Sequence, residues 1–222
     1  MSIKENLGKI KGDLNGSSAV LVAVSKTKPI EDIQKAYDLG IRDFGENKVQ
    51  EFISKEQNLP KDIRWHLIGH LQRNKVKYIV GKVYLIHSLD SVKLLQELEK
   101  HYKSEDLIAN VLLQINIGRE ASKTGVALEN LQDLIQACEK CTNIKVKGLM
   151  SVIPIGDEES CRYYFQQMKC IFEDLKNGQF NNISMEILSM GMTHDYKMAV
   201  EEGSTLIRIG EGIFGKRNYN NK

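Results

Sequence analysis

The chain has 222 residues, of which 41% are hydrophobic, and its 31 basic and 29 acidic residues give a formal net charge of +2 at pH 7. This near balance of charge predicts neither a nucleic-acid partner nor attachment to a charged membrane surface. No apolar run approaches the roughly 18 residues of a membrane span, and the first residues lack the apolar core of a signal peptide. We therefore expect a cytoplasmic protein.

A helix and then a buried strand are predicted at the start of the chain. Apolar residues recur at helical spacing over positions 2–14. Positions 19–24 form a continuous apolar run before Pro29, which is typical of a parallel strand covered on both faces. Lys26 lies just beyond this strand and, by the alternation of strand side chains, shares the side of Val24. We therefore expect Lys26 to leave the strand from a packed side.

The rest of the chain repeats a strand followed by a helix. Further strands are predicted near positions 41, 63, 83, 107, 144, 184 and 205, each followed by a helical pattern or its beginning. The helix after the third strand is expected over positions 71–80, and the fourth strand over 83–86. Eight such units favour a closed parallel barrel over an open sheet. No linker divides the chain, so we predict an α/β fold, a single-domain (β/α)8 TIM barrel over residues 1–222 with an extra N-terminal helix. A doubly wound open sheet is the alternative.

In a barrel of this type, the functional residues follow the carboxyl ends of the strands. The loops after strands 7 and 8 form the usual phosphate site, and Gly191 and Gly210 let the backbone approach an anion there. Thr193 offers a hydroxyl at the expected N-cap of the next helix. The predicted strand ends carry Lys26, Asn47, His66, Ser88, Asn116, Met150, Ser151 and the segments 190–193 and 208–210.

A lysine across the barrel mouth from a phosphate site favours a phosphorylated aldehyde as the ligand, held as a Schiff base. Pyridoxal 5'-phosphate (PLP) fits this description. The amine must be neutral to attack the aldehyde, and partial desolvation near other cations lowers its pKa. Lys28 is the rival lysine, but it lies in the turn before Pro29, where we expect it to be solvated. The sequence therefore favours Lys26.

Arg208, on the last predicted strand, bears on what the cofactor could do. PLP enzymes place an acid or an arginine near the pyridine nitrogen. An arginine there disfavours the protonated ring and weakens it as an electron sink. The alternative is an ordinary ion pair of Arg208 with Glu201, Glu202 or Glu211.

Six dispersed motifs resemble the pyridoxal phosphate homeostasis protein family, also called the proline synthase co-transcribed protein family, over nearly the whole chain. The motifs are the segments 23–29, 44–47, 65–75, 148–150, 188–192 and 202–210. The resemblance implies a barrel like the N-terminal domain of alanine racemase, with Lys26 as the Schiff-base lysine. It also implies cofactor contacts from Asn47, Ser189 and Met190 around the ring, Arg208 at the pyridine nitrogen, and Thr193, Gly210 and the amide of Glu211 on the phosphate.

The family resemblance implies a PLP-binding protein of intracellular PLP homeostasis, without established catalysis. Apo forms of PLP-dependent enzymes are the implied recipients of the cofactor. The alternative is a PLP-dependent amino-acid racemase or a related enzyme. Racemases of this barrel type are expected to use two catalytic bases, the second of which comes from another domain. Because the sequence ends at Lys222, we expect neither efficient racemisation nor the dimer that such a domain builds, and predict a monomer. A third reading is a phosphate-binding barrel that uses Lys26 as an aldolase-type residue.

Three positions depart from the family pattern. Lys48 stands where relatives usually carry tyrosine, Thr193-His194 replaces a serine-led turn, and Glu211 occupies a site usually taken by a small or hydroxyl residue. Thr193 keeps the hydroxyl. A carboxylate facing the phosphate would be repelled, so we expect the Glu211 side chain to turn away while its N–H contributes.

Metal and redox sites are weaker alternatives. His66 and His70 are four residues apart, but a strand-to-loop path puts them off a common face. The remaining histidines, His87, His101 and His194, are isolated in the sequence, and we expect structural or solvated roles for them. Cys138 and Cys141 have C-x2-C spacing without a second half-site, so we predict reduced, structural thiols.

Overall fold

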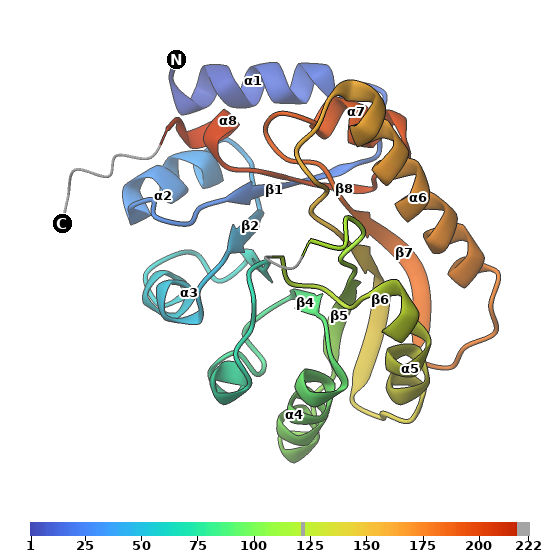
Figure 1. The fold of residues 1–222 in the computed structure, drawn as a ribbon. Helices are drawn as coiled ribbons and strands as arrows, with labels where there is room; N and C mark the ends of the chain where they lie inside the picture. Colours follow the sequence, from blue (N-terminus) through green and yellow to red (C-terminus); the bar gives the residue numbers. More distant parts are fainter. Residues whose placement is uncertain (121–122, 217–222) are drawn as a thin grey trace.

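Eight parallel strands close into a barrel in the computed structural model, which describes residues 1–120 and 123–216 (Figure 1). The strands pair in chain order, and β8 pairs with β1 to complete the circle. This confirms the predicted barrel and excludes the open sheet. The strands are β1 (Val20–Val24), β2 (Asp43–Glu46), β3 (Arg64–Leu67), β4 (Leu85–Leu89), β5 (Ala109–Gln114), β6 (Ile144–Met150), β7 (Ile183–Ser189) and β8 (Leu206–Ile209).

Helices follow the strands and form a ring outside the barrel (Figure 1). In the described part of the chain, none of them is long and apolar enough to cross a membrane. The helices are α1 (Ile3–Asp13), α2 (Ile30–Asp38), α3 (Val49–Glu56), the 3₁₀ helix η1 (Arg73–Tyr78), α4 (Val92–Ser104), α5 (Leu128–Glu139), α6 (Glu158–Lys176), α7 (Tyr196–Glu201) and α8 (Glu211–Phe214).

Two elements differ from the sequence prediction. The helix expected over positions 71–80 is the short 3₁₀ helix η1. Val76 within it and Ile79 at its C-cap are buried and three residues apart, which the three-residue turn of a 3₁₀ helix places on one side. The fourth strand runs through His87 and Ser88 to Leu89 instead of stopping at position 86. Both polar side chains are therefore strand residues, and both are fully buried.

Helix α1 is the predicted extra helix, and it packs against the last elements of the barrel (Figure 1). A capping box between Ser2 and Glu5 starts it. The Asn6 side-chain amide donates to the carbonyl oxygen of Ile213 at 2.9 Å, and Lys197 pairs with Asp13 at 2.8 Å. These contacts hold α7 and α8, and so the carboxyl end of β8, against the rest of the molecule.

The core has two layers, as a filled barrel requires. The larger layer lies between the strands and the helices and includes Phe44, Trp65 and Leu134. The inner layer fills the barrel itself with a small apolar cluster. The members of this inner cluster are Val22, Leu85, Leu112, Met150 and Leu206. Polar side chains occupy the rest of the interior.

Candidate functional site

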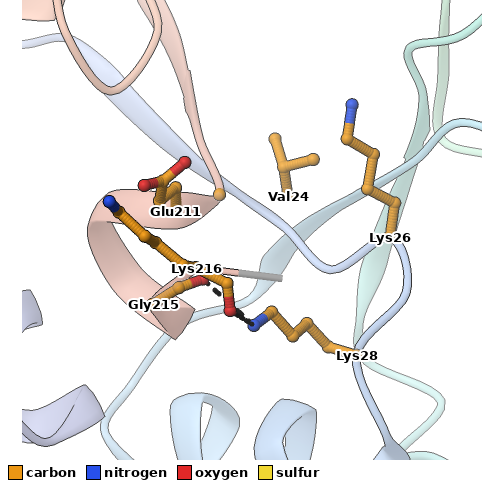
Figure 2. Close-up of a pocket in the computed structure, with 7 residues that line it drawn as sticks. Val24, Lys26, Lys28, Glu211, Gly215 and Lys216 are labelled. Atoms are coloured by element: carbon orange, nitrogen blue, oxygen red, sulfur yellow. Dashed lines mark hydrogen bonds between the residues drawn. The ribbon is translucent and has the colours of Figure 1, made fainter. Parts of the chain in front are cut away.

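A cavity of about 420 Å³ opens at the carboxyl ends of β1 and β8 (Figure 2). Its volume lies within the range of roughly 300–1,000 Å³ that is usual for small-molecule sites. Figure 2 shows Lys26 on one side of Val24 and Glu211 on the other. The lining residues are Val24, Lys26, Lys28, Gly210, Glu211, Gly215 and Lys216.

The β1–α2 turn presents Lys26 at one wall of this cavity. The Ser25 N–H extends the strand pairing by donating to Gly45 at 3.0 Å, and the Lys28 N–H closes the turn on the carbonyl oxygen of Ser25 at 3.0 Å. Thr27 has a φ of 64°, in the left-handed region that few non-glycine residues adopt. The Lys26 side chain is half-buried. The lysine is therefore delivered by a tightly shaped turn, on the side that strand alternation predicts.

A buried ionic cluster fixes this turn from behind. The Lys55 ammonium donates to the carbonyl oxygen of Ser25 at 2.8 Å, to Glu46 at 2.8 Å and to Glu51 at 2.7 Å. The Ser25 hydroxyl also donates to Glu46 at 2.6 Å, and the Thr27 N–H donates to Glu51. Burial raises the pKa of Glu46, against the lowering effect of Lys55. The cluster thus holds both residues that flank Lys26.

Replacing Lys55 by alanine is expected to lower the free energy of unfolding by about 3 kcal/mol, because it leaves a buried carboxylate without its cation. The measurement is urea unfolding at pH 7. Lys61→Ala is the matched control, since the Lys61 side chain is largely exposed and pairs with Glu56 at the surface. Equal midpoints for the two variants would contradict the role of the cluster.

Lys28 contacts the opposite wall of the cavity. Its ammonium donates to the carbonyl oxygens of Phe214 at 3.0 Å and Gly215 at 3.1 Å. Figure 2 shows the bond to Gly215. The expectation that Lys28 is solvated was therefore wrong, because the last carbonyls of α8 lack helical donors and take the ammonium instead. Lys28 ties the two walls together.

Gly210 and α8 form that opposite wall. A Cβ atom on Gly210 would lie 3.2 Å from the carbonyl oxygen of Val24, so the close approach of β8 to β1 favours glycine. The Gly212 N–H donates to the Thr193 hydroxyl at 3.2 Å. Thr193 is not the N-cap of α7, as the sequence suggested; Asp195 holds that place, and its carboxylate accepts from the Met192 N–H at 2.5 Å.

Glu211 is exposed and lies in the cavity wall. Its carboxylate was expected to turn away from the site. The residue itself lies at the start of α8, across Val24 from Lys26 (Figure 2).

Arg208, Ser189 and Met190 are buried in the barrel. The Arg208 guanidinium donates to the Ser189 carbonyl oxygen at 2.8 Å, to the Ser189 hydroxyl at 2.5 Å and to the Ser151 carbonyl oxygen at 2.8 Å. Burial lowers the pKa of Arg208 to about 10, so the group is charged at neutral pH. Two of the glutamates considered as partners of Arg208, Glu201 and Glu202, pair instead with Arg162 at 2.7 and 2.9 Å.

Asn47 follows β2 and is half-buried. A Cβ atom on Gly69 would lie 2.4 Å from the Asn47 carbonyl oxygen, so the second loop packs directly on the Asn47 backbone. Within the described residues, the side-chain oxygens of Asn47, Ser88 and Ser151 are buried without a hydrogen-bond partner. Buried polar atoms are normally bonded, so these atoms leave hydrogen-bonding capacity at the carboxyl ends of β2, β4 and β6.

The structure brings the predicted residues together only in part. Lys26, Gly210 and Glu211 line one cavity, and Thr193 contacts its α8 wall. Asn47, Ser189, Met190 and Arg208 lie outside the lining of that cavity, at the end of β2 and in the interior near β7 and β8.

His66 and His87 form a buried hydrogen-bonded pair that the sequence analysis missed. The His66 Nδ1 and His87 Nε2 atoms are 2.9 Å apart. His66 also contacts Asp43, and His87 contacts Ser189. His87, for which a structural or solvated role was expected, is fully buried and bonded on both nitrogens. The available signal was a histidine inside each of two neighbouring strands, β3 and β4.

The other residues considered for a metal or redox site, His70, Cys138 and Cys141, do not join the His66–His87 pair. His70 is exposed and faces Asp90 at 3.5 Å, away from the partners of His66. Over residues 1–120 and 123–216, no group of three or more histidine, cysteine or acidic residues is arranged to hold a metal ion. Burial raises the pKa of Cys138 to about 12 and that of Cys141 to about 11. Both are thiols at neutral pH.

Known proteins resemble this chain over almost its full length. Residues 1–218 match the family described as "Alanine racemase, N-terminal domain". The pyridoxal phosphate homeostasis protein of Aquifex aeolicus is 43% identical over 203 residues, 90% of this chain and 88% of that protein. The protein of the same name from Pasteurella multocida is 38% identical over 237 residues, 99% of each. PipY of Synechococcus elongatus PCC7942, solved with PLP bound, has a TM-score of 0.87 and 33% identity over 96% of this chain and 100% of that chain.

Proposed function

Because the chain belongs to the pyridoxal phosphate homeostasis protein family, we propose that it binds PLP and takes part in the intracellular homeostasis of this cofactor. One observation carries the proposal. A lysine at the end of β1 and a glycine at the end of β8 line one cavity of suitable volume, in a fold shared at 33% identity with a protein solved with PLP bound. The buried, unpartnered oxygens of Asn47 and Ser151 fit a polar ligand at the same end of the barrel.

Within this proposal, Lys26 holds the aldehyde of PLP as a Schiff base. Thr193, Gly210 and the backbone N–H of Glu211 bind the phosphate, since they meet at the start of α8. Asn47, Ser189 and Met190 surround the ring. Lys26 is half-buried and lines the cavity beside Lys28.

We propose that the bound cofactor is kept without catalysis. PLP supplies an electron-accepting ring to enzymes, most strongly when its pyridine nitrogen is protonated. Arg208 is a charged donor with three bonds to the protein, and a cation facing the ring nitrogen opposes that protonation. The homeostasis proteins that match this chain do so over nearly their whole length.

Cytoplasmic apo enzymes that need PLP are the proposed recipients, and the proposed state is a monomer.

Borohydride reduction followed by peptide mapping tests the covalent assignment. The protein is incubated with PLP, reduced and digested, and mass spectrometry locates the modified lysine. We expect the adduct on Lys26 and none on Lys28, whose ammonium is taken by the carbonyls of Phe214 and Gly215. An adduct found mainly on Lys28 would refute the assignment.

An amino-acid racemase is the second candidate, favoured by the match to the alanine racemase N-terminal domain. The PLP-loaded protein is incubated separately with L- and D-amino acids, and the chirality of each is followed. We expect no turnover comparable to that of dedicated racemases. Transfer of PLP from the loaded protein to an apo enzyme, followed by the recovered activity of that enzyme, tests the carrier role separately.

Substituting Glu211 by serine is expected to tighten PLP binding about fivefold, because one carboxylate beside the phosphate is removed at a solvent-exposed site. The measurement is an equilibrium titration of apoprotein with PLP. Glu129→Gln provides the control, since this exposed glutamate lies in the first turn of α5. Unchanged affinity in the Glu211 variant would mean that the phosphate does not bind beside α8.

A further inference from the structure

A chain of buried polar side chains crosses the interior of the barrel. It begins at Asp43, the first residue of β2, and passes through His66 on β3 and His87 on β4. It ends at Ser189 and Arg208, near the carboxyl ends of β7 and β8. Successive polar atoms are 3.0, 2.9, 3.1 and 2.5 Å apart. Every member is at most 6% exposed. The side chains thus link the two ends of the barrel.

The groups at the two ends of this series of side chains fix the direction in which its hydrogen bonds are donated. A guanidinium can only donate hydrogen bonds, and a carboxylate can only accept them. Arg208 therefore donates to the Ser189 oxygen. At the other end the Asp43 carboxylate must accept from His66, so with neutral imidazoles the Ser189 proton goes to Nδ1 of His87. His87 then donates from Nε2 to Nδ1 of His66. His66 in turn donates from Nε2 to the Asp43 carboxylate.

Both imidazoles must be neutral for this arrangement to hold. Each then has one donor nitrogen and one acceptor nitrogen, and three of the contacts use all four ring nitrogens. Burial lowers the pKa of His66, and it lowers that of His87 well below its ordinary value. The charged or titratable groups that face the pair are Asp43, Arg64, Tyr84, Glu186 and Arg208.

The Asp43 end opens to a second cavity, of about 350 Å³, at the amino ends of the strands. Asp43 accepts there from Nε and a terminal nitrogen of Arg64, at 2.8 and 2.5 Å. The Arg64 side chain is 50% exposed. The first residues of β1, β2, β3 and β8 line this cavity, so it lies opposite the one lined by Lys26.

We propose that Asp43, His66 and His87 are positioning residues, which fix the Ser189 hydroxyl and through it the Arg208 guanidinium beside the PLP ring. This inference rests on the proposed function. Because the Ser189 proton is committed to His87, the Ser189 oxygen presents only acceptor capacity to Arg208. The end of the barrel where the strands begin is thereby coupled to the cofactor end, and the coupling consists only of the direction of the hydrogen bonds.

Nitrogen NMR of the unmodified apoprotein tests the direction without any cofactor. With 15N-labelled histidine, we expect both His66 and His87 to carry their proton on Nε2. We also expect a scalar coupling across the hydrogen bond from Nε2 of His87 to Nδ1 of His66. An Nδ1–H form of His87, or no coupling between the rings, would overturn the proposal. No substitution is needed, so a folding defect cannot obscure this result.

An Asp43→Asn variant tests the coupling between the two ends. An amide can donate as well as accept, so the direction is no longer imposed and His87, which has no bond to Asp43, is expected to gain an Nδ1–H population. The absorption maximum and pH profile of the PLP-loaded variant are expected to shift. Glu186→Gln makes the same chemical change in the same cavity but outside the chain, and it should behave as the wild type.

An Asp43→Asn protein that matches the wild type in the His87 nitrogen shifts and in the cofactor spectrum would overturn the inference, because a merely structural network would give that result. A wild-type protein that fails to bind PLP would overturn the proposed function and the cofactor side of this inference. The coupling in the apoprotein separately decides whether the directed chain exists.

Discussion

Lys26→Ala protein is expected to lose completely the absorption band that PLP gives when it is bound to the wild type. The bond proposed to produce the band needs the side-chain amine, and alanine offers none. The measurement is an absorption spectrum after addition of PLP and removal of the free cofactor, before and after borohydride. Borohydride should fix PLP to the wild type and not to the variant.

Two further variants make this result specific. Lys26→Arg keeps the positive charge in the cavity but has no amine that forms a stable Schiff base, so it should retain weak PLP binding without the band. Lys93→Ala removes an exposed lysine of α4, outside the cavity, and should keep the band unchanged. A band in Lys26→Ala as strong as that of the wild type would refute the assignment.

The stability of the fold is expected to fall as the pH drops below about 6.5. His66 and His87 have lowered pKa values because they are buried, so the folded chain keeps them neutral while the unfolded chain takes up protons from pH 6.5 downwards. Each histidine then removes about 1.4 kcal/mol per pH unit until its folded pKa is reached. Between pH 6.5 and 5, the pair removes at most about 4 kcal/mol.

Two carboxyl groups modify this dependence at lower pH. Arg64 and His66 hold the pKa of Asp43 at about 2 against the opposing effect of burial, so Asp43 contributes stability above pH 4 that is lost as the pH falls towards 2. Glu46 acts in the opposite direction. Its pKa is raised by burial, so the folded state takes up this proton first and gains stability as the pH falls towards 4.5.

Urea unfolding at pH 7, 6 and 5 measures the histidine effect. The variant His66→Gln should show a shallower dependence of the unfolding free energy on pH, because one of the two buried titrating groups is gone. His101→Gln is the control, because His101 is a partly exposed residue of α4 that pairs with Glu97, and it should keep the wild-type slope. Equal slopes in all three proteins would contradict the assignment of neutral buried histidines.

The barrel was predictable because short strand patterns recur between helices that have an apolar stripe, and these patterns depend on local sequence alone. The same reasoning missed His87. A polar pair inside a strand breaks the apolar pattern, so the strand was predicted to end at position 86, whereas it continues to Leu89. His87 is tolerated there because His66 and Ser189, from distant parts of the chain, satisfy its nitrogens.

Lys26 and Gly210 could be proposed from sequence because a strand end determines where each lies in a barrel. The partners of Lys28 could not, since they are carbonyl groups 186 and 187 positions further along the chain. Nor could the place of Glu211 in the cavity wall, which depends on how α8 packs. Backbone groups carry no side-chain signal, so contacts of this kind become visible only in three dimensions.

The Lys28 contact has a consequence for synthesis of the protein. Its acceptors, Phe214 and Gly215, follow Lys28 by 186 and 187 residues, so one wall of the Lys26 cavity is synthesised well before the other. Contacts between such distant residues form late in folding, since a long loop must close first. A nascent chain that stops before β8 has the lysine but no cavity. We therefore expect PLP to bind only to completed barrels, and its binding to stabilise the whole fold rather than any part of it.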